Sequence, residues 1–168
     1  MAVFDPEHFF EQAERLSAPD AAGAPRQVDL RRAISAAYYG VFHFILTAAA
    51  DQFAGAKDRN LPRYELIYRS IDHQSVRSIC AETAKPELPA KLARYAPSGF
   101  DQPIRSFARI FAELQEKRHA ADYDPLIKFS FADASTAIAQ ARAAVRYFQE
   151  GKPDQRKAFL TFLKFKPR

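Results

Sequence analysis

The stretch Leu30–Asp51, LRRAISAAYYGVFHFILTAAAD, places apolar side chains at helical spacing over more than five turns. At about 100° per residue, one side of such a helix collects only apolar and aromatic side chains. These are Ile34, Tyr38, Val41, Phe42, Ile45, Ala49 and, just beyond the stretch, Phe53. The pattern predicts a long helix over about residues 28–53 that buries this face in the core.

A second stripe of the same helix is polar and adjoins the apolar one. It consists of Arg32, Ser35, Tyr39 and His43. A face that only meets water would more naturally carry Lys and Glu, so this stripe is expected to border another helix, a partner subunit or a ligand. Alternatively, the four groups hydrogen-bond to one another or to backbone carbonyls at a helix interface.

The rest of the chain shows the same periodicity, interrupted by short polar joints. Further helices are expected over about residues 5–16 and 62–81, from about residue 101 into the segment 116–125, and over residues 130–150, followed by a short last helix capped by Asp154. Asp5 is expected to cap the first of them. Ser130 and Asp133 form a capping-box pattern, and Gly151 closes the helix that they open. Residues 85–100 contain three prolines and predict a loop with one helical turn.

Composition supports one all-α domain. The chain has 168 residues, of which 48% are hydrophobic and only five are glycine, whereas a β-sandwich or barrel needs glycine-rich turns at short intervals. Helices of roughly 20 residues with short joints favour an antiparallel up-and-down bundle of four to five main helices with a short C-terminal helix. The bundle is expected over residues 1–150, with residues 151–168 as a basic amphipathic segment.

The net charge of +5 belongs entirely to that last segment, which holds six bases and one acid. Residues 1–150 are neutral overall. The segment also carries Phe159, Phe162 and Phe165. A basic amphipathic helix of this kind can bind RNA, an acidic partner or a membrane surface, or it can pack its phenylalanines onto the bundle and leave its charges in water.

The remaining composition excludes several classes of protein. No run approaches 18 uninterrupted apolar residues, and the N-terminal sequence MAVFDPEHFF has acids where a signal peptide needs bases. A cytoplasmic protein without a membrane partner is therefore expected. The single cysteine, Cys80, excludes a disulfide framework, and neither a metal site nor a cofactor is expected.

The segment EKRHAADYDP, Glu116–Pro125, ends the helix that starts near Asp101. Arg118 shares the apolar side of that helix with Phe107 and Phe111, so it must be paired or reach a polar pocket. Asp122, four residues later, can supply the partner. His119 points about 100° away, which argues against Arg118 and His119 acting on one atom.

Two segments together, RRAISAAYYGVFHF at residues 31–44 and RHAADYD at residues 118–124, resemble the HEPN superfamily (higher eukaryotes and prokaryotes nucleotide-binding). The similarity covers residues 1–150. It implies a compact helical bundle that often forms a homodimer and binds RNA or a nucleotide. It also implies a prokaryotic toxin-antitoxin or defence setting, with an antitoxin or a nucleotidyltransferase-type protein as partner.

In the ribonucleases of that superfamily, the resemblance implies, an arginine and a histidine four to six residues further on meet across a dimer and cleave RNA without a metal ion. Arg118 matches the arginine, but Tyr123 stands at the nearest position to the histidine. A tyrosine with an ordinary pKa near 10 is a poor proton shuttle at neutral pH. The sequence departs from the nuclease pattern at this position.

The resulting hypothesis is a nucleotide-binding, RNA-binding or partner-regulating module. Arg118, Asp122 and Tyr123 would form its site, with the stripe from Arg32 to His43 as the opposite wall. One alternative is an active ribonuclease in which His43, His73 or His119 replaces the missing histidine. Arg69 and His73, expected on one face of one helix, are too close in sequence for the superfamily spacing. A second alternative is a purely structural interaction domain.

Overall fold

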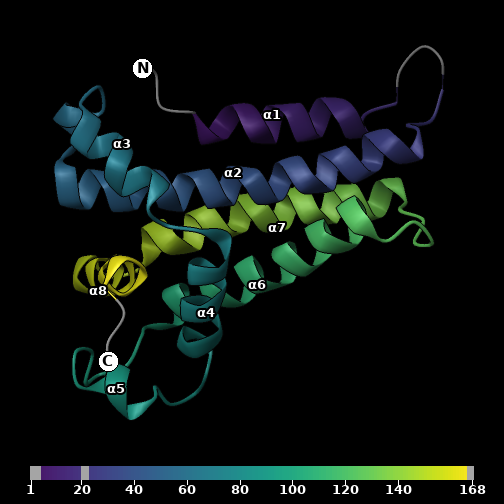
Figure 1. Cartoon of the computed structure of the whole chain (residues 1–168). Coiled ribbons are helices and arrows are strands. Elements are labelled where there is room, and N and C mark those ends of the chain that lie inside the picture. The colour runs from purple at the N-terminus through teal and green to yellow at the C-terminus, as the bar shows by residue number, and fades with distance from the viewer. Residues whose placement is uncertain (1–4, 20–22, 166–168) are drawn as a thin grey trace.

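The computed structural model describes residues 5–19 and 23–165, and this part of the chain confirms the predicted all-α class (Figure 1). It forms eight α-helices and one 3-10 helix. They are α1 (Pro6–Ser17), α2 (Gln27–Ala54), η1 (Ala56–Asp58), α3 (Pro62–Arg69), α4 (His73–Thr83), α5 (Ala90–Ala93), α6 (Gln102–Tyr123), α7 (Phe131–Glu150) and α8 (Pro153–Lys164).

Helix α2 is the centre of the bundle. It packs against α1, α6 and α7, and α1 and α6 run antiparallel to it (Figure 1). The α1–α2 joint and the α6–α7 connection lie at the same end of the molecule, as expected for an up-and-down bundle. Helix α3 turns back along the C-terminal part of α2, and α4 packs against α6.

The predicted apolar stripe of α2 does face the core. Ile34, Tyr38, Val41, Ile45 and Ala49 have at most 1% of their surface exposed, because neighbouring helices cover this face. Phe42 is also buried, and Phe53, at the end of the helix, is half-buried. By length and composition α2 could span a membrane, but 72% of its most apolar window is buried inside the protein, as in the core helix of a soluble domain.

Helix α7 contributes a row of small residues that allows close approach. Ala134, Ala137, Ala141 and Ala144 are fully buried, and α7 packs on both α2 and α6. The alanine seam is therefore used inside the chain. The capping box at its start is formed as predicted, since the backbone N–H of Asp133 donates to Ser130 Oγ at 3.2 Å and the backbone N–H of Ser130 donates to Asp133 Oδ2 at 2.7 Å.

The prediction of one helix over residues 62–81 is wrong, because the structure has two helices there, α3 and α4. Asp72 caps a new helix by accepting a hydrogen bond from the backbone N–H of Ser75 at 2.6 Å. Arg69 ends α3 and His73 begins α4, so these two residues do not share one helical face. The cap predicted at Asp154 is also wrong. Lys152 is the N-cap of α8, and Asp154 lies inside its first turn.

The C-terminal segment packs onto the bundle. Phe159, Leu160, Phe162 and Leu163 of α8 are buried, and the Phe159 ring lies edge-on against Phe107 of α6 at 5.4 Å between centroids. Lys166 and Arg168, which the sequence analysis counted in this segment, lie outside the described residues.

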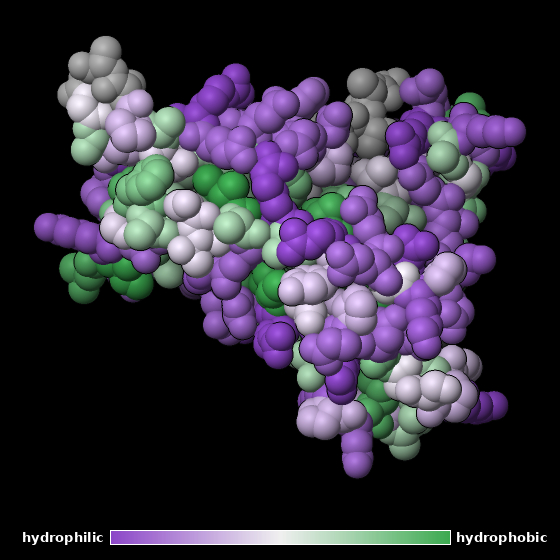
Figure 2. Space-filling view, turned by 180° about the vertical axis from the view of Figure 1, so that it is seen from behind, coloured by the Kyte–Doolittle hydropathy of each residue, from purple (hydrophilic) through white to green (hydrophobic). Residues whose placement is uncertain are grey.

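Exposed apolar side chains gather at the end of the bundle that holds the α6–α7 connection. They are Val28, Tyr123, Leu126, Ile127 and Phe131, and Leu126 is the most exposed at 88%. Figure 2 shows hydrophobic atoms at this end of an otherwise mostly hydrophilic face. We call these five residues the apolar end.

Gly40 lets α1 approach α2. A Cβ atom at this position would lie 2.3 Å from Cε1 of the buried Phe10 ring. We expect Gly40→Ala to lower the free energy of unfolding by about 1–3 kcal/mol, as other overpacked core substitutions do. Helix propensity alone would act in the opposite direction, by about 1 kcal/mol.

Urea denaturation measures this change. Phe10→Leu provides the matched background, because loss of the ring should relieve most of the Gly40→Ala penalty in the double variant. A more stable Gly40→Ala protein would show that the contact does not control the packing of α1.

Candidate functional site

Arg118 lies on the inner side of α6, as its position on the helix predicts. Its side chain is only 12% exposed, and its guanidinium lies over the rings of Tyr38 and Tyr39, with its carbon atom Cζ at 5.2 and 5.9 Å from their centroids. Such contacts between a cation and aromatic faces are favourable, and more so where water is excluded. The two consecutive tyrosines of α2 therefore form a platform for this arginine.

Asp122 supplies the counter-charge. Its Oδ2 atom lies 3.5 Å from Nη1 of Arg118, and its side chain is 18% exposed. The hydroxyl of Ser35 on α2 donates a hydrogen bond to the other carboxylate oxygen, Oδ1. Ser35 thus fixes the orientation of the carboxylate, and the structure brings together Arg118, Asp122, Ser35 and Tyr39, four of the residues selected from the sequence.

His73, the first residue of α4, completes this group. Its Nδ1 atom is 2.7 Å from the hydroxyl of Tyr38, and its ring stacks on Phe42 at 3.8 Å between centroids. Burial lowers the pKa of His73, and the charge of Arg118 lowers it further against the opposing effect of Asp72. Burial also raises the pKa of Tyr38, so this hydroxyl keeps its proton and can donate it to Nδ1.

A second histidine-tyrosine pair lies beside the first. Nδ1 of His43 on α2 is 2.5 Å from the hydroxyl of Tyr68 on α3, and the His43 ring stacks on Phe9 of α1 at 4.8 Å. Burial, followed by the proximity of His73, lowers the pKa of His43. Burial raises the pKa of Tyr68 to about 12. Both histidines are therefore neutral at pH 7.

The other predicted residues lie further out. His119 is exposed, and so is Tyr123, whose ring centroid is 5.0 Å from that of His119. Arg32 is exposed on α2 and has no hydrogen bond or ion pair with the described residues. Its neighbour Arg31 instead links α2 to the end of α6 and the segment after it. Arg31 donates hydrogen bonds to the carbonyl oxygens of Ala121, at 2.8 Å, and Ile127.

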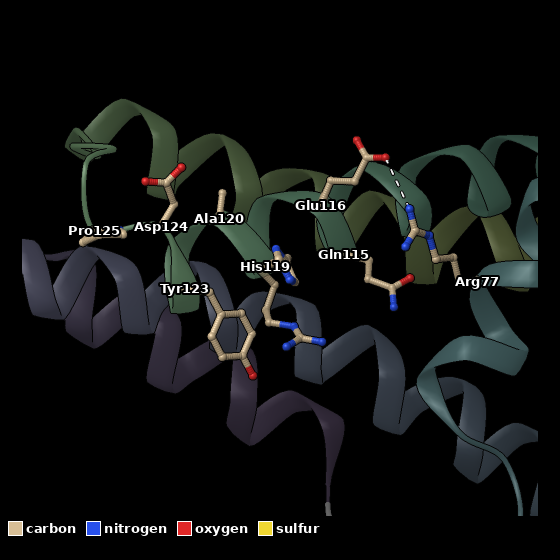
Figure 3. Close-up of a pocket in the computed structure, with 9 residues that line it drawn as sticks. Arg77, Gln115, Glu116, His119, Ala120, Tyr123, Asp124 and Pro125 are labelled. Atoms are coloured by element: carbon tan, nitrogen blue, oxygen red, sulfur yellow. Dashed lines mark ion pairs between the residues drawn. The ribbon is translucent and has the colours of Figure 1, made fainter.

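Arg118 lines a cleft of about 620 Å³ between α6 and α4 (Figure 3). Arg77 of α4 lies on its far side and faces Glu116 across it, with 4.0 Å between Nη2 and Oε1. The lining residues are Arg77, Gln115, Glu116, Arg118, His119, Ala120, Tyr123, Asp124 and Pro125. Within residues 5–19 and 23–165, two of these have a buried polar atom without a hydrogen-bond partner, Arg118 Nε and Gln115 Oε1.

Sequence reasoning missed three residues of this site. Tyr38 was assigned to the core by its position on the helix, and the core position is correct, but nothing in the sequence shows that its hydroxyl meets His73. Arg77 carries no local signal. Gln115 could have been found, since it lies four and eight residues before His119 and Tyr123 and so shares their helical face.

Comparison of the chain with protein-family models, with curated proteins and with solved structures gave no match. In the described part of the chain, no three His, Cys, Asp or Glu side chains converge so as to hold a metal ion. The chemistry of the site is therefore that of one enclosed arginine, its carboxylate and two neutral histidines, next to an open cleft.

Asp122→Asn tests the counter-charge. The amide cannot neutralise Arg118, so we expect the free energy of unfolding to fall by about 1–3 kcal/mol, the usual cost of a poorly satisfied charged group. Glu116→Gln, which removes an exposed acid of the same helix, should change it by less than about 0.5 kcal/mol. Equal effects in urea denaturation would mean that the pair contributes nothing specific.

The two histidines predict a pH dependence. Their folded pKa values lie below the unfolded value of about 6.5, so the unfolded chain binds more protons as the pH falls. Their contribution to stability is complete above about pH 6.5 and is lost as the pH falls towards the folded pKa values. We therefore expect the free energy of unfolding to decrease between pH 7.5 and 5.5.

Urea titrations at several pH values measure this decrease, and His73→Gln is the comparison. Glutamine retains a hydrogen-bond acceptor for Tyr38 but does not titrate, so the decrease should become smaller. Identical pH profiles for the two proteins would contradict the assignment to His73.

Proposed function

We propose that the chain is a HEPN-like module that binds a nucleotide or RNA through Arg118, without the standard nuclease histidine. The setting implied by the resemblance is a prokaryotic toxin-antitoxin or defence system. The apolar end of the bundle is consistent with the contact that a homodimer or a regulating partner protein would need, because exposed apolar groups of this kind often mark interfaces.

One observation carries this proposal, namely the enclosed arginine at the edge of the cleft. Desolvation makes a guanidinium a strong partner for an anion, and a guanidinium matches the geometry of a phosphate. Asp122 neutralises the arginine from one side at 3.5 Å, which is longer than an optimal charged hydrogen bond. Nε has no hydrogen-bond partner, so the donors of Arg118 are incompletely used in the free protein.

The cleft also has the dimensions of a ligand site. Its volume of about 620 Å³ falls within the range of about 300–1,000 Å³ typical of small-molecule pockets. Its charged lining residues are Arg77 and Arg118, with Glu116 at 73% exposure and Asp124, whose Oδ1 accepts the backbone N–H of Leu126. Glu116 therefore lies in solvent, whereas the guanidinium of Arg118 is enclosed and paired with Asp122.

The position of His73 favours a second candidate, a metal-independent ribonuclease. The neutral His73 and Arg118 both contact the ring of Tyr38. The centroid of the His73 ring lies 5.6 Å from that of Tyr38, and Cζ of Arg118 lies 5.2 Å from the same centroid. In the tautomer with its ring proton on Nδ1, donated to the Tyr38 hydroxyl, His73 has a free lone pair on Nε2 that would take the proton of the ribose 2′-hydroxyl as this oxygen attacks the phosphorus. The imidazolium formed in this way would give that proton to the departing 5′-oxygen, while Arg118 stabilised the charge on the phosphate.

Isothermal titration of the purified protein with AMP, GMP and short RNA oligonucleotides tests the binding proposal. Arg118→Gln should weaken binding by at least about tenfold, because a charged hydrogen bond contributes about 1.5–3 kcal/mol. Arg109→Ala is the matched control. This arginine is exposed, and its position nine residues earlier places it on the opposite side of α6, so affinity should not change.

Incubation of the same proteins with total RNA in EDTA separates the candidates. Cleavage that is lost in both Arg118→Gln and His73→Gln would establish the ribonuclease. Binding without cleavage at high protein concentration would favour the binding module. If no nucleotide or RNA binds and no RNA is cleaved, Arg118 and the residues around it only stabilise the fold. This outcome would favour the hypothesis of a purely structural interaction domain.

A further inference from the structure

Three residues of α6 form one row along the cleft. Gln115, His119 and Tyr123 are spaced by four, so each lies about 6 Å further along the helix axis on the same face. Figure 3 shows this row on the cleft side of α6, with Glu116, Ala120 and Asp124 in a second row next to it. The residues that pack α6 into the bundle, such as Phe107, Phe111 and Leu114, lie on its inner side, and the row lies outside this packed face.

The last two residues of the row are rings that make few contacts within the chain. Tyr123 is 66% exposed, and its ring centroid lies 5.0 Å from that of His119, with an angle of 52° between the two ring planes. Aromatic side chains exposed beside a cationic group are the usual platform for the flat face of a nucleobase. Because the two rings are inclined to each other, a flat base would stack on one of them and meet the edge of the other.

Gln115, one turn before His119 in the same row, is the polar residue of the row placed to meet the edge of that base. Its Oε1 atom has less than 1 Å² of exposed surface and no hydrogen-bond partner among residues 5–19 and 23–165. A buried carbonyl oxygen without a partner is costly, and a ligand that donates a hydrogen bond would remove that cost once the amide has turned its oxygen towards the cleft. The amide also carries an NH2 group, so it can serve one donor and one acceptor at once.

We propose that this row makes the cleft selective for adenine, carried by a nucleotide or by RNA. The base would lie against His119 and Tyr123, and the Gln115 amide would accept from the adenine amino group and donate to the adjacent ring nitrogen. A glutamine amide matches this pair of groups, whereas guanine presents two acceptors on the same edge. The inference rests on the proposed function, because Arg118 is assigned to the phosphate.

The first measurement is the ratio of the dissociation constants for AMP, GMP, CMP and UMP, determined by isothermal titration. We expect AMP to bind about fivefold or more tightly than GMP, which is the lower limit for a good bidentate contact. Oligo(A) and oligo(U) of equal length distinguish the two sources of the base. Tighter binding of oligo(A) than of AMP would identify RNA as the ligand.

Variants of Gln115 test selectivity for the base separately from affinity for the phosphate. Gln115→Met keeps the length of the side chain and removes its polar atoms, so it should abolish the preference for AMP while retaining affinity for GMP. Gln115→Arg should reverse the preference, because arginine pairs with the two acceptors of guanine. Gln149→Met, an exposed glutamine of α7, is the control and should leave the ratio unchanged.

The outcomes separate this inference from the proposed function. If all four mononucleotides bind equally, or if Gln115→Met keeps the wild-type ratio, base selection by Gln115 is wrong and binding through Arg118 stands. If no nucleotide or oligonucleotide binds, both proposals fail. A preference for AMP that disappears only in the Gln115 variants supports the inference.

Discussion

The guanidinium of Arg118 is enclosed between α6 and α2, and its buried charge needs polar partners from the surrounding helices. The charge needs a carboxylate, which Asp122 supplies from one turn further along α6. That carboxylate needs a donor, which Ser35 supplies from α2. The Tyr38 ring that supports the guanidinium carries a hydroxyl, and this buried group needs the nitrogen of His73 at the start of α4. One buried charge thereby fixes the relative position of three helices.

The same arrangement places the proposed ligand-binding residues and the structural residues on different sides of one helix. The inner side of α6 carries the cluster around Arg118, whereas the neighbouring side carries Gln115, His119 and Tyr123 and faces an open cleft. Because residues of α2 and α4 contact this cluster, the cleft side of α6 is held in place by its packing against them. Such pre-organisation reduces the entropy that a ligand must overcome on binding.

Much of the fold was predictable because it depends on local patterns. The apolar stripe of α2 and the capping box of α7 are visible in the sequence, and so is the placement of Arg118 beside Asp122. The break between α3 and α4 was not predicted, because an aspartate within a helical pattern is usually an exposed polar residue. Only the structure shows that Asp72 caps the N-terminus of α4. The role of His73 depends on Tyr38, 35 residues earlier, and such contacts arise only from the packing of helices.

Helix α3 is attached to the protein in an unusual way for an element of this bundle. Of its eight residues only Tyr64 is buried, and its links to α2 are hydroxyl hydrogen bonds, from Tyr64 to Asp51 at 2.9 Å and between Tyr68 and His43 at 2.5 Å. Apart from the rings of Tyr64 and Tyr68, detachment of α3 exposes little apolar surface, so its opening costs less than global unfolding. The backbone amides of α3 should thus exchange with solvent deuterium well before those of α2, and each opening uncovers the ring of His43.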